Sequence, residues 1–270
     1  MQIGVIGLGL IGSSFARAVK QYTNLRVAGY DRDPDIMEAA LRDKAVDAAD
    51  EQQACASDLV FVCLFPEAAV EFILSHTFPH IVCDVCGVKR YVAQQLSGIP
   101  GYVGVHPMAG REVSGYHAGD ADLFRGASLI ITADENTDKA NVQKIQEFAP
   151  GIGFGQVVVT TPEKHDRVIA YTSQLAHVVS SAYVKSDTAP DYLGFSAGSF
   201  ADMTRVARLD PQMWAQLFLE NPANLSAEIE KLIGHLLEYK KAIDKGDRGE
   251  LLRLLGEGRD RKDLLDRLRE

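Results

Sequence analysis

The chain has 270 residues, 46% of them hydrophobic and 24% charged, which is an ordinary composition for a globular protein. That length exceeds what one compact core usually holds, so we expect two domains. The 28 basic and 37 acidic residues give a net charge of -9, which argues against non-specific binding to nucleic acid or to an anionic membrane.

Strand-like runs rich in β-branched residues alternate with amphipathic segments in the first part of the chain. The strand-like runs span residues 3–6, 25–30, 59–64, 81–85 and 102–105. The helix-like segments between them include residues 11–21, 35–43 and 67–76. This alternation predicts βαβ units and a mostly parallel sheet. Two later runs, 127–132 and 156–161, flank a helical stretch over 138–148, and we expect them to extend the same sheet.

The pattern changes after Pro162. From there the hydrophobic residues recur with the period of a helix, over residues 166–185, 221–245 and 247–269. We therefore predict an α/β fold with a sheet domain over residues 1–162 and an all-helical domain over residues 163–270. The last stretch carries seven leucines among many charges, which suits packing on a partner or on a neighbouring helix.

The cysteines and the N-terminus indicate a compartment. Cys55, Cys63, Cys83 and Cys86 all lie in the first third, and a secreted disulfide scaffold would be shorter and richer in cysteine. The CxxC at 83–86 has no second pair to complete a four-ligand site, and the histidines show no paired spacing, so we predict no metal. No apolar run reaches the ~18 residues of a membrane span, and no basic residue precedes the first apolar run. We therefore expect a cytoplasmic protein.

A glycine-rich motif follows the first strand-like run and opens the first helix-like segment. Gly7, Gly9 and Gly12 form GxGxxG, a weak signal alone but typical of dinucleotide binding in this position. Gly7 permits the tight turn, Gly9 lets the backbone approach a pyrophosphate, and Gly12 lets helix and strand pack closely. The helix N-terminus would then meet the phosphates. We assign Leu10 and Ile11, at the helix start, to the same cofactor site.

An acidic residue stands where the second strand-like run ends. Asp31 follows Gly12 by nineteen residues, and its carboxylate would accept hydrogen bonds from the adenosine ribose hydroxyls. The same carboxylate would repel a 2′-phosphate, so we predict NAD rather than NADP, although Arg32 partly offsets that repulsion. Phe65, at the end of the run over 59–64, is also assigned to the cofactor site.

His106 directly follows the run over 102–105, at the edge of the sheet where a nicotinamide would lie. A dehydrogenase needs a base for the alcohol proton, and the near-neutral pKa of histidine suits that task. Position alone leaves a second interpretation equally open, a histidine that only ends a strand or completes a turn.

Several sequence blocks resemble those of the prephenate/arogenate dehydrogenase family. They are His106-Pro107-Met108-Ala109-Gly110, Asp84-Val85-Cys86-Gly87-Val88-Lys89, His165-Asp166, Ser173-Gln174-Leu175-Ala176-His177, residues 199–205, and Asp210-Pro211-Gln212-Met213-Trp214. The resemblance runs from Gly7 to about Glu230. It implies a Rossmann-type domain followed by a helical dimerisation domain, a homodimer, and a small anionic substrate, prephenate or arogenate.

The resemblance also implies residue roles. His106 is the catalytic histidine that hydrogen-bonds the ring hydroxyl, Arg205 binds a substrate carboxylate, and Ser173 and His177 contact the substrate. Trp214 is expected to reach the site from the dimer mate. The implied reaction is the oxidative decarboxylation of prephenate to 4-hydroxyphenylpyruvate with reduction of NAD, in tyrosine biosynthesis. Taken singly, His177 is more typical of a core, Arg205 of a solvated surface, and Trp214 of a core or an interface.

Three positions depart from the family pattern. Gly87 stands where the family usually carries a serine that helps to orient the histidine, and Cys86 or Ser114 are candidates to replace that contact. Arg111 stands where many members carry threonine, and Ala176 where proline is common. These departures bear on the substrate more than on the fold or the cofactor.

Two other functions stay open. The chain is also compatible with another two-domain Rossmann dehydrogenase of the 3-hydroxyacid or imine type. The hydroxyacid group uses a helical lysine, and Lys164 and Lys185 lack the glycine-rich neighbourhood expected there. A function of a different class also stays open, because Gly87 replaces the family serine: the chain is also compatible with a protein that senses NAD and catalyses no reaction.

Overall fold

The structure is a computed structural model that describes residues 1–111 and 113–268. It divides into two compact units, Met1–Asn221 and Pro222–Glu270. The boundary at residue 162 therefore stays a prediction about domains. None of the helices in the described residues is both long and apolar enough to cross a membrane.

The first unit begins with a five-stranded, fully parallel sheet in the order β3-β2-β1-β4-β5. Its strands are β1 (Gln2–Ile6), β2 (Arg26–Tyr30), β3 (Ala48–Ala49), β4 (Leu59–Val62) and β5 (Ile81–Asp84). The chain winds outward in one direction from β1 to β3 and then returns to β4 on the other side of β1. A crevice forms at such a reversal, beyond the carboxyl ends of the strands, and ligands of open α/β sheets bind there.

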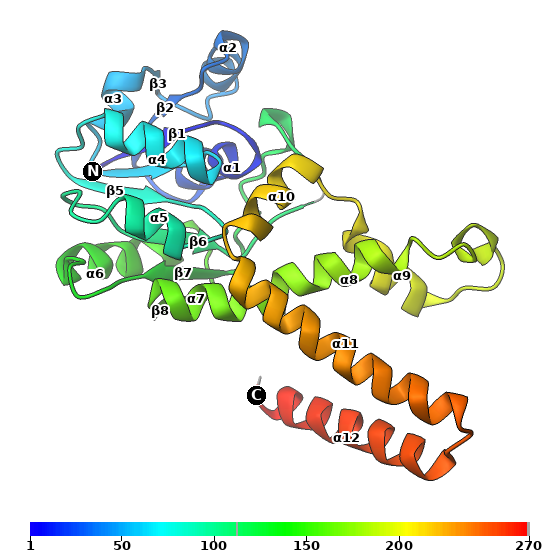
Figure 1. Cartoon of the computed structure of the whole chain (residues 1–270). Coiled ribbons are helices and arrows are strands. Elements are labelled where there is room, and N and C mark those ends of the chain that lie inside the picture. The colour runs from blue at the N-terminus through cyan, green and yellow to red at the C-terminus, as the bar shows by residue number, and fades with distance from the viewer. Residues whose placement is uncertain (112, 269–270) are drawn as a thin grey trace. The chain divides into compact units, whose positions relative to one another are not determined.

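Helices cover both faces of this sheet (Figure 1). They are α1 (Leu10–Tyr22), α2 (Pro34–Arg42), α3 (Glu51–Cys55), α4 (Pro66–Ser75) and α5 (Arg90–Gln95). Buried residues of α1 and α2 pack in one hydrophobic core, and those of α3, α4 and α5 pack in a second. The predicted helices over 11–21, 35–43 and 67–76 are confirmed. The short α3 and α5 were not predicted, because five or six residues show too little periodicity.

A second sheet follows, made of β6 (Gly104–Pro107), β7 (Ser128–Thr132) and β8 (Gln156–Thr160), with α6 (Lys139–Phe148) between the last two. β6 pairs antiparallel with β7, and β7 pairs parallel with β8. One bridge, Val82 to Tyr102, links it to β5. The expectation that both later runs extend the first sheet was therefore wrong. A β-branched run indicates a strand but not the neighbour with which it pairs.

The described residues after β8 form no further strand, as predicted for the second half. In the first unit these helices are α7 (Pro162–Ile169), the π-helix Ala170–Gln174, α8 (Leu175–Tyr183), α9 (Gly198–Thr204) and α10 (Pro211–Leu219). α7, the π-helix and α8 form one continuous helical run, because Ala170 and Leu175 at the junctions keep helical dihedral angles.

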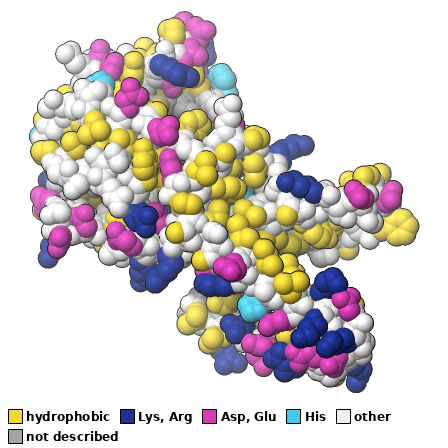
Figure 2. Space-filling view, viewed as in Figure 1, with side chains coloured by type: hydrophobic (Ala, Val, Ile, Leu, Met, Phe, Trp, Pro, Cys, Tyr) yellow, Lys and Arg dark blue, Asp and Glu magenta, His cyan; other side chains and the backbone are white. Residues whose placement is uncertain are grey.

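The second unit is a pair of helices, α11 (Pro222–Asp244) and α12 (Arg248–Arg267). The Tyr239 hydroxyl of α11 donates to the Leu254 carbonyl oxygen of α12 at 3.1 Å, and Leu254 is buried. Charged side chains gather over α12 (Figure 2), and many join as ion pairs between successive turns. The predicted leucine-rich helix is confirmed.

Candidate active site

The glycine turn after β1 leaves no room for side chains at two of its positions. Gly7 has a φ of +82°, and a Cβ there would lie 2.6 Å from the Cys63 carbonyl oxygen. A Cβ on Gly12 would lie 1.8 Å from the Gly7 carbonyl oxygen. The Gly7 N–H donates to the Tyr30 carbonyl oxygen at 2.8 Å, which ties the turn to β2. The turn thus requires the glycines that the motif predicted.

Gly9 differs, because a Cβ there would meet nothing within 4 Å. It is the N-cap residue of α1 and supplies no capping side chain, and the first turn of the helix carries no acidic residue. Leu10 and Ile11, in that first turn, are partly exposed. Open space before an uncapped helix N-terminus offers N–H donors and a positive dipole end to an anion. These features fit the pyrophosphate of a dinucleotide.

Asp31 follows β2 and faces this turn. Its Oδ2 accepts the Leu8 N–H at 2.8 Å, and its Oδ1 accepts the Asp33 N–H at 3.1 Å. A carboxylate has about four acceptor positions, so these bonds fix its orientation and still allow it to bind hydroxyl groups. Phe65 is the N-cap residue of α4, at the same edge of the sheet, with its side chain 58% exposed.

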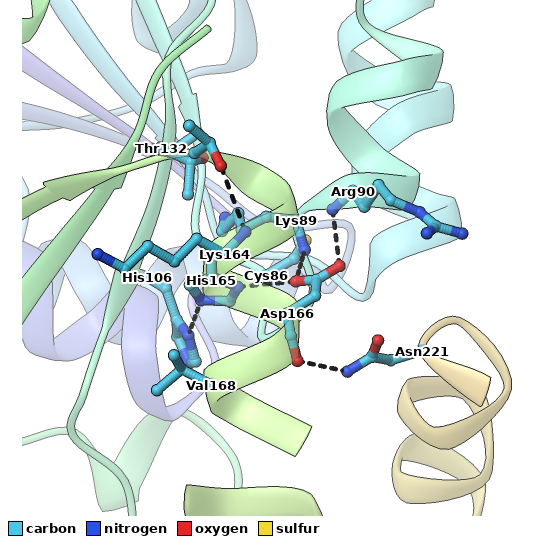
Figure 3. A network of polar contacts seen from close by, with 12 residues as sticks. Cys86, Lys89, Arg90, His106, Thr132, Lys164, His165, Asp166, Val168 and Asn221 are labelled. Atoms are coloured by element: carbon cyan, nitrogen blue, oxygen red, sulfur yellow. Dashed lines mark hydrogen bonds and ion pairs between the residues drawn. The ribbon is translucent and has the colours of Figure 1, made fainter. Parts of the chain in front are cut away.

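His106 is the third residue of β6, whereas the sequence predicted that it directly follows the strand. Its side chain is half-buried. Its Nδ1 lies 2.9 Å from Nε2 of His165, and Nδ1 of His165 lies 2.7 Å from Oδ1 of Asp166 (Figure 3). His165 and Asp166 come from α7 and are only 2% and 1% exposed. Two elements far apart in sequence thus meet through a row of three side chains.

Backbone groups hold the Asp166 carboxylate in place. Its Oδ1 accepts the Lys89 N–H at 2.8 Å, and its Oδ2 accepts the Arg90 N–H at 2.9 Å. The Asn221 side-chain amide donates to the Asp166 carbonyl oxygen at 2.8 Å, as Figure 3 shows. The start of α5, the first turns of α7 and the residues after α10 therefore converge on one aspartate.

A buried ion pair lies beside this row. Lys89 Nζ contacts Asp84 Oδ1 at 2.6 Å, and both side chains are fully buried. The Tyr102 hydroxyl donates to Asp84 Oδ2 at 2.8 Å, and the Cys86 N–H donates to Asp84 Oδ1 at 2.9 Å. The Asp84–Lys89 block of the sequence is therefore a closed loop joined by its own first and last residues.

The surroundings keep both histidines of the row neutral. Burial lowers the pKa of His106 well below its ordinary value, and the nearby His165 and Lys89 lower it further. Burial also lowers the pKa of His165, against the opposing effect of Asp166. A neutral imidazole can accept a proton, so His106 has the protonation state that a general base requires at neutral pH.

Gly87 lies beside the other nitrogen of His106. A Cβ on Gly87 would be 3.8 Å from His106 Nε2 and 3.6 Å from a methyl group of Leu217, both ordinary contact distances. The Cys86 thiol, one of two groups considered as a replacement for the family serine, instead contacts the Leu64 carbonyl oxygen at 3.7 Å. Ser114, the other, has an exposed side chain. The contact that orients His106 comes from His165.

Ser173 and His177 lie on the helical run that also carries His165. The π-helix contains Ser173, and His177 is in the first turns of α8. Nδ1 of His177 lies 2.9 Å from the Ser173 carbonyl oxygen, and its ring stacks on Trp214 with centroids 3.7 Å apart. Trp214 therefore packs on a histidine of its own chain. π-helical turns occur frequently at functional sites.

The π-helix is also tied to α10. The Gln174 side-chain amide donates to the Leu217 carbonyl oxygen at 2.9 Å, and its own oxygen accepts from Asn221 at 2.8 Å. Since Leu217 is the residue that faces Gly87, the segment with Ser173 and His177 and the strand with His106 border the same region.

Arg205 begins a short 3-10 helix, Arg205–Ala207, that packs against α8. Its side chain is exposed, and the same holds for Asp202 in α9. The structure thus places Arg205 next to α8, the helix that carries His177. His106 is instead hydrogen-bonded to His165 of α7.

His165 and Asp166 belong to the family resemblance in the sequence, but no role was predicted for either residue. One signal was available, an adjacent pair of polar side chains in the first turns of a helix that Thr161 caps and Pro162 begins. A buried His-Asp pair at that position requires partners, and these prove to be the catalytic candidate and the start of α5.

A glycine turn at the switch point of a parallel sheet, with a neutral imidazole at the same edge, is the arrangement of a Rossmann-type dehydrogenase. Two family models match the chain, those of the prephenate dehydrogenase nucleotide-binding domain over residues 15–170 and dimerization domain over residues 161–257. The chain belongs to the prephenate dehydrogenase family.

Individual relatives agree with this assignment. The chain is 36% identical to the cyclohexadienyl dehydrogenase of Zymomonas mobilis, over 93% of this chain and 91% of that protein. The prephenate dehydrogenase of Bacillus subtilis is 28% identical, over 95% of this chain and 74% of that protein.

Solved structures agree as well. The Aquifex aeolicus prephenate dehydrogenase in complex with hydroxyphenyl propionate and NAD+ superimposes with a TM-score of 0.86 at 28% identity, covering 98% of both chains. The Synechocystis arogenate dehydrogenase gives 0.84 at 26% identity, over 98% of this chain and all of that one.

Proposed function

We propose that this protein catalyses the NAD-dependent oxidative decarboxylation of prephenate to 4-hydroxyphenylpyruvate, in tyrosine biosynthesis, as a homodimer. The observation that carries the proposal is the neutral His106, with Nδ1 bonded to His165 and Nε2 beside the Cβ-free Gly87. Membership in the family supplies the reaction class, and the domain assignment 1–162 and 163–270 belongs to the same proposal.

His106 would move one proton. Its Nε2 accepts the proton of the ring hydroxyl while the carbinol C–H bond breaks, and the bound NAD supplies the acceptor for that hydride. The bond to the ring carboxylate then breaks, CO2 leaves, and the bonding electrons make the ring aromatic. The proton returns from His106 to the ring oxygen, so no net proton is lost. Because aromatisation is strongly downhill, the protein mainly has to position and deprotonate the substrate.

The remaining site residues would bind the substrate and the cofactor. Arg205 would pair with a carboxylate, because its planar fork offers two parallel donors. Ser173 and His177 would line the substrate pocket on the helical run that faces Leu217. Asp31 would bind the ribose hydroxyls of NAD with the carboxylate that Leu8 orients.

Arogenate is a second candidate substrate, and it differs from prephenate in carrying an amino group in place of the side-chain keto group. The similarity of this chain to the Synechocystis arogenate dehydrogenase, with a TM-score of 0.84, supports this candidate. The two substrates must therefore be compared directly.

Steady-state formation of NADH tests the proposal, with prephenate, arogenate and a 3-hydroxyacid as substrates and with NAD and NADP as cofactors. We expect turnover of prephenate with NAD, and a loss of about 10²- to 10⁴-fold in kcat for His106→Asn with unchanged affinity for NAD. Turnover of 3-hydroxyacids alone would assign a different dehydrogenase. NAD binding without any turnover, or full activity of His106→Asn, would contradict the catalytic role of His106.

A further inference from the structure

The row of His106, His165 and Asp166 fixes where its hydrogens lie. Both oxygens of Asp166 accept backbone N–H groups, from Lys89 and Arg90, and backbone N–H groups can only donate. This pattern is that of an ionised carboxylate. The third contact of Asp166, at 2.7 Å from Nδ1 of His165, is therefore a bond that His165 donates.

That first assignment determines the next one. A neutral imidazole carries one hydrogen, so a His165 protonated at Nδ1 has only a lone pair at Nε2. This lone pair faces Nδ1 of His106 at 2.9 Å, and His106 must donate that bond. Nε2 of His106 then holds the lone pair, on the side that faces Gly87.

We propose that His165 and Asp166 are positioning residues that hold His106 in the tautomer with hydrogen on Nδ1 and the basic lone pair on Nε2. The proposal rests on the function proposed for His106 and extends it to two residues that are buried beside it. The backbone N–H groups of Lys89 and Arg90 belong to the same arrangement, because they orient the Asp166 carboxylate.

The opposite tautomer of His106 is disfavoured by the burial of its partners. It would set two lone pairs against each other at the His106–His165 contact, or would require His165 to turn its hydrogen away from Asp166. His165 is 2% exposed and Asp166 1%, so water cannot supply the missing hydrogen bond in either case. Removing the hydrogen-bonded partner of a metal-ligating histidine commonly costs about 10- to 100-fold in activity, and we expect a similar range for a histidine that acts as a base.

Charged neighbours favour the same arrangement. The Lys89 ammonium lowers the pKa of both histidines, and it is itself paired with Asp84. Burial is the largest cause for both histidines and acts in the same direction as Lys89, against the raising effect of Asp166 and Asp84 on the pKa of His165.

Two substitutions at residue 165 separate positioning from packing. In His165→Gln the amide oxygen takes the place of the Nε2 lone pair and can still accept from His106. His165→Leu has a similar volume and no acceptor. We expect kcat to fall about 10- to 100-fold in His165→Leu and less than about 5-fold in His165→Gln, with the affinity for NAD unchanged in both.

A substitution at Asp166 tests the direction of the row. Asp166→Leu has a similar volume but removes the acceptor that fixes the hydrogen of His165 on Nδ1, so the row no longer sets the tautomer of either histidine. We expect the hydrogen of His106 to be shared between Nδ1 and Nε2 and kcat to fall by more than about 10-fold.

The deciding readout is the ¹⁵N chemical shift of the two ring nitrogens of His106, assigned by the loss of its signals in His106→Asn. We expect hydrogen on Nδ1 in the unmodified protein and in His165→Gln, and on both nitrogens in Asp166→Leu. Hydrogen on Nε2 in the unmodified protein, an unchanged tautomer in Asp166→Leu, or equal losses of kcat in both residue 165 variants would overturn the proposal. The spectra need no turnover, so a failure of the proposed reaction would be seen separately.

Discussion

Replacing Lys89 with methionine is expected to destabilise the protein by about 3–5 kcal/mol, because it leaves a buried carboxylate without its counter-charge. Asp84 is fully buried, and the ammonium at 2.6 Å is one of three groups that contact it. The Tyr102 hydroxyl and the Cys86 N–H remain, at 2.8 and 2.9 Å, but neither is charged. Methionine matches the lysine stem closely, so the lost charge dominates over lost packing.

The double variant Lys89→Met/Asp84→Asn gives the sharper test. Asparagine removes the unpaired charge and still offers an oxygen to the Cys86 N–H and an amide to the Tyr102 oxygen. We expect it to be more stable than Lys89→Met alone by about 1–3 kcal/mol, although it carries one more substitution.

The assay is urea denaturation followed by circular dichroism, with Lys20→Met as the matched control. Lys20 pairs with Asp47 at the same distance, 2.6 Å, but both side chains are about 30% exposed. Screening by water limits the expected effect of the control to about 1 kcal/mol or less. Equal effects of Lys89→Met and Lys20→Met, or additive losses in the double variant, would refute the reasoning.

Three further predictions concern the cofactor turn, the base and the aromatic stack. Gly9→Ala is expected to weaken NAD binding at least about 10-fold at an unchanged melting temperature, whereas Gly12→Ala also lowers that temperature, because its Cβ would lie 1.8 Å from a carbonyl oxygen. Burial lowers the pKa of His106, so the acid limb of the kcat/KM profile is expected below about pH 6.5, with a plateau above it; a limb above pH 7 would contradict a neutral base. Trp214→Ala removes the ring stacked on His177 and is expected to raise the KM for the substrate more than it lowers kcat; an unchanged KM would place that stack outside the pocket.

The sequence was sufficient for the parallel sheet and its glycine turn. Gly7 and Gly12 have local reasons, a positive φ and a backbone contact, that a short motif can encode. The segments over 11–21 and 67–76 are long enough to show helical periodicity, and the structure confirms them.

The sequence was insufficient where partners lie far apart along the chain. The bond between His106 and His165 joins residues separated by 59 positions, and the bonds from Lys89 and Arg90 to Asp166 span 77 and 76. No local sequence pattern predicts a contact between residues so far apart along the chain. The prediction that the two later runs extend the first sheet was wrong for the same reason. The whole fold, and not the local sequence, determines which strands pair, and β7 pairs with β6 in a separate sheet.

The widened turn at Ala170–Gln174 has a consequence for how this helix can vary. One helical run carries His165 toward the base and His177 toward Trp214, and the turn between them holds an extra residue relative to regular α-helix. Deleting a single residue there would restore regular α-helix and leave the residues on either side facing nearly as before, whereas the same deletion within α7 or α8 would rotate everything downstream by roughly 100°. The widened turn is thus the place where this helix can lose a residue while His165 and His177 keep their directions.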